Sequence, residues 1–128
     1  MKLKLYQLEN VMMAENGQLS VLGKLFKQDL PIKDAWNVSG VIRKITPEHE
    51  KFLENRNKLI LKHGTLTEGT KDKYKFEGEN AENFAKESDE LLGTEVEIDI
   101  IKIKISSLED KNISMSPGEM NLLEWLFE

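Results

Sequence analysis

The 128-residue chain contains no cysteine, only two histidines, and no apolar run that approaches the roughly 18 residues needed to span a bilayer. The absence of cysteine excludes disulfides and thiolate metal sites, and it makes a reducing cytosol the natural setting. The start of the chain, MKLKLYQLENV, lacks the continuous apolar core and the small-residue cleavage site of a signal peptide. We therefore expect a cytoplasmic protein with no membrane partner.

Sequence patterns that carry catalysis are also scarce. His49 and His63 fall on one predicted helix, about 20 Å apart, so they cannot share a metal or form a dyad. The stretch GTLTEGTK at 64–71 departs from a phosphate loop because Thr70 separates the second glycine from the lysine. Dinucleotide, zinc-protease and serine-hydrolase motifs do not occur. We predict no catalytic, metal-binding or cofactor-binding residues and a non-enzymatic function, which should survive replacement of both histidines by glutamine.

Charge is abundant but unevenly distributed along what we take to be a single domain, 1–128. Residues 1–64 carry 11 basic and 7 acidic side chains, net +4, whereas residues 65–128 carry 7 and 16, net −9. The favoured interpretation is attraction between the two halves of one fold. The alternative is an acidic face that binds a basic partner or mimics nucleic acid. Nucleic-acid binding ranks lower because the sequence pI is about 5.2.

Apolar spacing predicts four helical regions. The first is interrupted by Asn16-Gly17, which separates a short helix from one over about 18–28. A long helix over 32–63 is expected to kink at 46–47, with Thr46 as a cap and Gly64 in a left-handed conformation at its end. Helices are also predicted over 79–92 and 117–128, the last with Ser116 in a capping box. The predicted buried stripe of the long helix comprises Ile32, Ala35, Trp36, Ser39, Ile42 and Ile45, widened by Val38 and Val41.

The stretch TEVEIDIIKIKIS at 94–106 alternates first in one phase and then in the other. Side chains alternate with period two along a strand, so this reversal requires a bulge or a break at Ile100-Ile101. Acidic residues line the outer face of the first half, and Lys2 and Lys4 line that of MKLKLY. We therefore predict that residues 1–6 pair with 95–100, because opposite charges across paired strands are stabilising. After the break, the change from acidic to basic residues would reflect a different neighbour or solvent.

The expected fold is therefore α+β. It comprises a long kinked helix or helical hairpin, packed with a small antiparallel sheet from 1–6, 73–77 and 95–105, and a short C-terminal helix. Trp125 lies beside a second apolar line, Leu122 and Leu126, on that last helix. This face either docks on a partner or folds back onto the domain, and the sequence leaves the two open. The candidate protein interface comprises Trp125, Leu122, Leu126, Glu95, Glu97 and Asp99.

The order of LPIKDAW, FLENRNKLILKHG, NFAKESDELLGTEVEIDI and SPGEMNLLEWLFE gives the chain a recognisable outline over nearly its whole length. It resembles a group of small proteins encoded by tailed bacteriophages and prophages of low-GC Gram-positive bacteria. The resemblance implies a phage origin and no particular activity.

Three functions remain open at this point. The leading one is a non-catalytic phage accessory protein in the host cytoplasm that binds a host or phage protein, as a modulator of a host factor or defence system. The alternatives are a virion or assembly component, and a module that binds a small ligand or nucleic acid. Assembly into a homo-oligomer also stays open.

Overall fold

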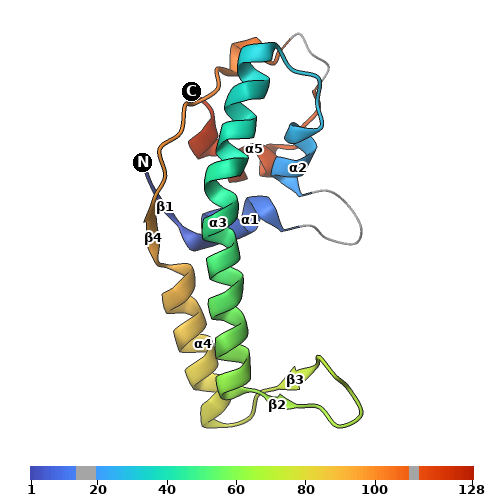
Figure 1. Cartoon of the computed structure of the whole chain (residues 1–128), viewed down its shortest axis with the longest axis vertical. Helices are drawn as coiled ribbons and strands as arrows, with labels where there is room; N and C mark the ends of the chain where they lie inside the picture. Colours follow the sequence, from blue (N-terminus) through green and yellow to red (C-terminus); the bar gives the residue numbers. More distant parts are fainter. Residues whose placement is uncertain (14–19, 110–112) are drawn as a thin grey trace.

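The computed structural model describes residues 1–13, 20–109 and 113–128. It is an elongated molecule in which one long helix, α3 (Ile32–His63), runs along most of its length (Figure 1). The mixed fold with a long helix, small antiparallel sheets and a short C-terminal helix is confirmed. The predicted turn at Asn16-Gly17 lies outside the described residues.

The remaining elements precede and follow α3 along the chain. The order is β1 (Lys2–Lys4), α1 (Leu5–Met12), α2 (Val21–Phe26), then α3, β2 (Thr65–Leu66), β3 (Tyr74–Lys75), α4 (Glu79–Leu92), β4 (Glu95–Glu97), a 3₁₀ turn η1 (Ile105–Ser107), α5 (Pro117–Leu122) and a second 3₁₀ turn η2 (Glu124–Leu126). The capping box at Ser116 is confirmed, since its hydroxyl accepts from the Glu119 amide at 3.1 Å. The predicted helix over 117–128 ends at Leu122, and the chain continues as η2.

The long helix passes through Pro47 without ending. The Thr46 hydroxyl donates to the Ile42 carbonyl at 2.7 Å, so Thr46 is an interior residue and its predicted role as a cap is wrong. The helix ends at Gly64, whose φ of −92° is not left-handed as predicted. A β-carbon at Gly64 would lie 2.6 Å from the Ile60 carbonyl oxygen and 3.0 Å from the Phe76 ring. Glycine is therefore required there, because a β-carbon would collide with the last turn of α3 and would also crowd the residues of β3 and its flank.

The strand pairing predicted from charge is confirmed over residues 2–4 and 95–97, whereas residues 5–6 belong to α1 and not to the predicted strand. Antiparallel β1 and β4 place Lys2 opposite Glu97 and Lys4 opposite Glu95, with Leu3 and Val96 between them. The prediction that 73–77 joins this sheet is wrong. Instead, β3, which lies within the predicted strand 73–77, pairs with β2 in a separate hairpin, and no strand was predicted at β2.

The reversal within 94–106 corresponds to the end of a strand. After Glu97 the chain leaves the ladder, burying Ile98 and exposing Ile101. Ile103 is buried again and forms an isolated parallel bridge with Phe127, in which the Ile103 amide donates to the Leu126 carbonyl at 2.9 Å. The predicted break and change of neighbour occur, but the strand already ends at Glu97, so the predicted strand over 98–105 is wrong apart from the bridge at Ile103. The new neighbour is the C-terminal segment.

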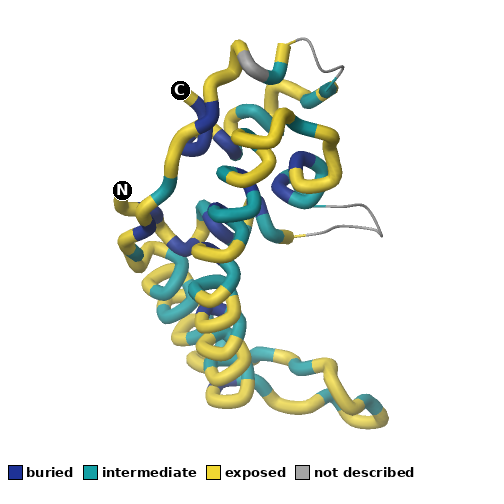
Figure 2. The backbone as a smooth tube through the Cα atoms, turned by 45° about the horizontal axis from the view of Figure 1, so that its top comes forward, coloured by how far each residue is buried: buried dark blue, intermediate teal, exposed yellow. Residues whose placement is uncertain are grey.

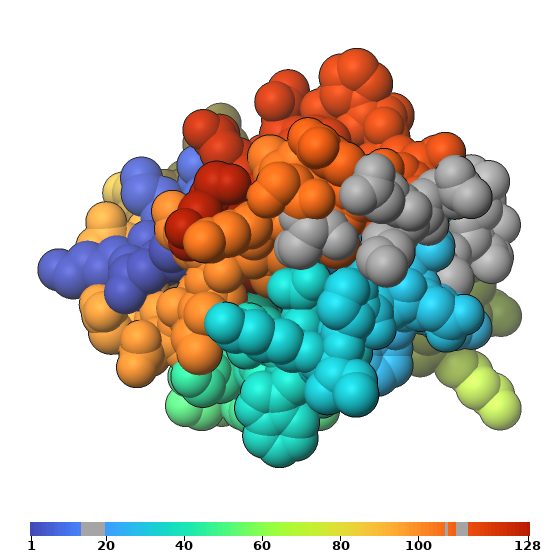
Figure 3. All heavy atoms as spheres, turned by 90° about the horizontal axis from the view of Figure 1, so that it is seen from above, coloured from blue at the N-terminus to red at the C-terminus, as the bar shows by residue number. Residues whose placement is uncertain are grey.

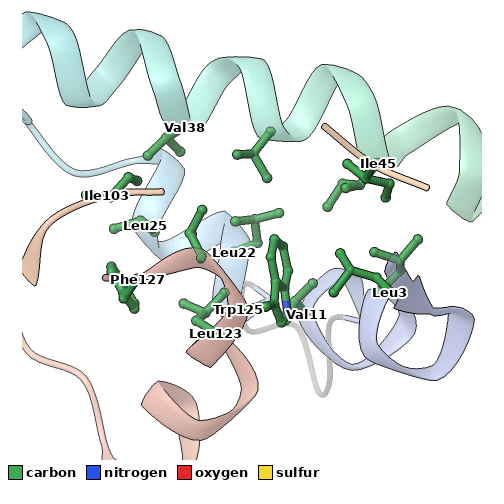
Figure 4. Packing of buried hydrophobic residues seen from close by; sticks show 14 of the residues in the cluster. Leu3, Val11, Leu22, Leu25, Val38, Ile45, Ile103, Leu123, Trp125 and Phe127 are labelled. Atoms are coloured by element: carbon green, nitrogen blue, oxygen red, sulfur yellow. The ribbon is translucent and has the colours of Figure 1, made fainter. Parts of the chain in front are cut away.

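The core occupies one end of the molecule. Side chains from α1, α2, the first half of α3 and the C-terminal segment converge on it (Figure 4). The buried segments gather there in Figure 2, whereas none of the fully described residues of α4 is buried. The other end consists of α4 packed along the second half of α3, with the β2–β3 hairpin beside it (Figure 1).

The buried face of α3 covers only part of the predicted stripe. Val38, Val41 and Ile45 are buried as predicted, together with Phe52, whereas Ile32 is 91% exposed and Trp36 67% exposed, so their predicted burial is wrong. The helix carries more apolar residues than one face can bury. The packing of α1 and α2 against the valine side leaves Ile32 and Trp36 at the surface.

Candidate protein-interaction surface

The structure places the predicted C-terminal interface residues largely inside the protein. Trp125 is 8% exposed and Leu126 0%, while Leu122 is half-buried. Figure 4 shows the Trp125 ring beside Val11, between α1 and the C-terminal segment. The exposed-face alternative for Trp125 is therefore wrong, and the segment folds back onto the domain. The reason is that the chain becomes a 3₁₀ turn after Leu122, which directs Leu123, Trp125 and Leu126 inward.

The predicted acidic residues are exposed but do not form one acidic cluster. Glu95 and Glu97 face the lysines of β1, and the N-terminal amine contacts Glu97 Oε1 at 2.9 Å. This amine lowers the pKa of the Glu97 carboxyl from its ordinary value, with a smaller contribution from Lys2. Asp99 presents its carbonyl to Lys44 Nζ. The main role of the charges on β4 is therefore to fix the register in which β4 pairs with β1.

A different surface combines exposed aromatic, aliphatic and basic side chains. We define the Trp36 surface as Ile32, Trp36, Arg43 and Lys44 of α3 together with Ile101, which is 66% exposed. Ile32 and Trp36 are four residues apart and therefore neighbours on one helix face. The Arg43 guanidinium lies 4.9 Å from the centroid of the Trp36 ring, in a cation–π contact.

A shallow depression of about 150 Å³ joins the two segments of this surface. Trp36, Arg43 and Lys44 line one side, and Ile100 and Ile101 line the other. Figure 3 shows the start of α3, in teal, lying beside the orange segment that follows β4. The surface is thus built from two segments that are about 60 residues apart in the sequence.

The charge of this region is opposite to that of the whole chain. Residues 31–47 contain Lys33, Arg43 and Lys44 against Asp34 alone, net +2, whereas the chain has a formal net charge of −5. All three basic side chains are exposed. A partner that covers the apolar side chains of this surface would meet exposed cations around them. A partner surface with acidic residues is therefore the electrostatic complement.

The sequence missed this surface because it assigned Ile32 and Trp36 to the buried stripe. The sequence nevertheless contains a spacing pattern that distinguishes the buried residues of α3 from Ile32 and Trp36. Val38, Val41, Ile45 and Phe52 follow helical spacing over four turns, and they form the buried line by themselves. Ile32 and Trp36 lie off that line.

Both histidines contact a carboxylate on a neighbouring helix, which the sequence pattern did not predict. His49 of α3 contacts Glu9 of α1, and Arg56 Nη1 lies 3.3 Å from the same carboxylate. His63, which is buried at the end of α3, contacts Glu87 of α4.

Lys62 Nζ lies 3.2 Å from the other Glu87 oxygen. The hydrogen bonds from His63 and Lys62 lower the pKa of Glu87. Glu9 thus joins α1 to α3, and Glu87 joins α4 to α3. Among residues 1–13, 20–109 and 113–128, no group of three or more acidic or histidine side chains could hold a metal ion.

Comparisons with protein families, with curated proteins and with solved structures found no match to this chain. None of the helices in the described part of the chain is long and apolar enough to cross a membrane.

Proposed function

We propose that this protein acts by binding another protein through the Trp36 surface, without catalysis of its own. The observation that carries the proposal is the 67% exposure of Trp36 on a long, well-anchored helix, with Arg43 stacked on its ring. Tryptophan and arginine are, with tyrosine, the side chains most enriched at binding hot spots. The helix behind them is fixed by the buried residues Val38, Val41 and Ile45, so the surface is presented without a large ordering cost.

The partner we propose has an acidic patch surrounding an apolar contact. Trp36 and Ile101 supply the apolar contact, while Arg43 and Lys44 supply the charge. The resemblance described above favours a bacterial cell infected by a phage as the setting, with a host factor or defence protein as the partner. A virion or assembly protein is the alternative partner, and the same surface would serve it. Self-association is a further outcome that the experiment below distinguishes.

The test is affinity purification of the tagged protein from the bacterial host, followed by mass spectrometry and by titration with the purified partner. Trp36→Ala and Ile101→Ala should each weaken binding by at least about tenfold, the size of a moderate hot spot. Leu61→Ala is the matched control, because Leu61 is also on α3 and is 63% exposed, but lies near its other end.

A partner that all three variants retain equally would contradict the proposal. Sedimentation of the protein alone identifies a second copy as the occupant, if dimerisation is lost in Trp36→Ala and kept in Leu61→Ala.

A further inference from the structure

A second hollow lies between α1 and the C-terminal segment, and it shares no residue with the Trp36 surface. Its volume is about 550 Å³, within the range of small-molecule sites. Its polar lining comprises Tyr6, Gln7 and Asn10 from α1, Lys102 from the segment after β4, and Asn121 and Glu124 from the C-terminal segment. We call it the α1 groove.

Five of these six polar side chains are not used within the described part of the protein. Tyr6, Asn10, Lys102, Asn121 and Glu124 make no side-chain hydrogen bond or ion pair with any other described residue. Such a concentration of unpaired polar groups in one concavity leaves their hydrogen-bonding capacity available to a bound molecule.

Gln7 is the one polar lining residue with an internal partner. Its side-chain oxygen accepts from the Lys4 amide at 2.8 Å. That bond fixes the orientation of the side-chain amide, so its NH₂ group is left to donate.

Trp125 adds an independent indication at the buried side of the groove. The residue lines the groove and is 8% exposed, yet its indole Nε1 has no acceptor among the described residues. A buried donor without a partner is costly, on the order of 1–3 kcal/mol, and native proteins rarely leave one. Figure 4 shows the nitrogen-bearing part of the ring on the side of Val11, which belongs to α1. The donor itself is buried, so the groove is lined by the Trp125 side chain rather than by its free N–H.

The charges of the groove restrict the ligand. Lys102 and Glu124 have opposite charges, come from different segments and form no ion pair with each other. A ligand that carries both an anion and a cation can satisfy the two at once, whereas an ion of one sign meets repulsion from one of them. The side-chain amides of Gln7, Asn10 and Asn121 match the alternating donors and acceptors of peptide bonds.

We infer that the α1 groove binds a short zwitterionic peptide. Its carboxylate lies at Lys102, its ammonium group lies at Glu124, and its peptide bonds pair with the side-chain amides. This site is distinct from the proposed protein-binding surface and does not depend on it.

The two tryptophans make a direct test possible, because each gives one indole N–H signal in a ¹⁵N–¹H correlation spectrum. The Trp36→Phe variant assigns the signals, after which the wild-type protein is titrated with triglycine to millimolar concentration. The Trp125 signal should shift saturably, and the Trp36 signal should stay in place as an internal control. Lys102→Met and Glu124→Gln should each raise the Kd at least about tenfold. Lys102 and Glu124 are exposed, and an unchanged spectrum checks that both variants are folded.

Three further ligands define the chemistry. Triglycine blocked by an acetyl group and an amide lacks both charges and should bind at least about tenfold more weakly. Free glycine distinguishes an amino-acid site from a peptide site by its relative affinity. Glucose is an uncharged polar control and should not bind. The inference is overturned if triglycine does not shift the Trp125 signal, if glycine binds more tightly than triglycine, if blocked and free triglycine bind equally, or if the charge variants bind as the wild type does.

Discussion

The assignment of one tryptophan to the core and the other to the surface predicts very different costs of removing them. A tryptophan side chain buries about 150–250 Å² when enclosed. At Trp125, where 8% is exposed, roughly 180 Å² is removed from water, equivalent to about 4.5 kcal/mol at about 25 cal/mol per Å². At Trp36, where 67% is exposed, the corresponding figure is roughly 65 Å², or about 1.5 kcal/mol.

Two smaller effects at Trp36 nearly cancel. Alanine has the higher helix propensity, by about 0.5 kcal/mol, whereas loss of the exposed cation–π contact with Arg43 costs about as much. We therefore expect Trp125→Ala to lower the free energy of unfolding by about 3 kcal/mol more than Trp36→Ala does. Urea unfolding followed by circular dichroism measures both values. Equal losses, or a larger loss for Trp36→Ala, would refute the assignment of faces and remove the basis of the Trp36 surface.

Two electrostatic predictions complete the set. The contacts with His63 and Lys62 lower the pKa of Glu87 in the folded protein. The Glu87 carboxylate therefore stabilises the folded state at pH values above the ordinary glutamate pKa of about 4.3. This stabilisation is lost as the pH falls through the pKa of Glu87 in the folded protein. The urea midpoint of Glu87→Gln should therefore depend less steeply on pH in this acid range than that of the wild type, and an identical dependence would contradict the contact. On the paired strands, Glu95→Lys should destabilise by about 0.2–1 kcal/mol by facing Lys4. Adding Lys4→Glu should restore most of the loss, and a double variant less stable than Glu95→Lys alone would argue against the register.

The parts of the fold that the sequence predicted correctly are those in which local pattern and physical constraint agree. The β1–β4 register followed from lysines and acids at matching parity, since one residue of slip would place charge in the core. The capping box at Ser116 needs only four consecutive residues. The reversal at Ile100-Ile101 was informative for the same reason, because its two phases cannot belong to one flat strand.

The errors arose where the outcome depends on distant segments. Trp36 and Val38 lie on the same helix, and only the packing of α1 and α2 decides which of them is buried. The partners of the histidines are about 40 and 24 residues away in the sequence, on helices whose relative placement periodicity does not give. Two of the candidate interface residues predicted from the sequence, Leu122 and Trp125, line the α1 groove. The sequence did not decide whether they are buried.

Both proposed sites belong to the end of the molecule that contains the core, and this follows from how the chain distributes its apolar residues. Residues of α1, α2 and the C-terminal segment close one half of α3, so side chains at their margins are held by rigid neighbours. Trp36 and the α1 groove both lie at such margins. The other half of α3 packs on α4, which buries no residue fully and is tied to α3 by the contacts of Glu87 with Lys62 and His63. Binding sites need preorganised side chains. The well-packed end provides them, whereas the α4 end has fewer buried contacts to hold a site in place.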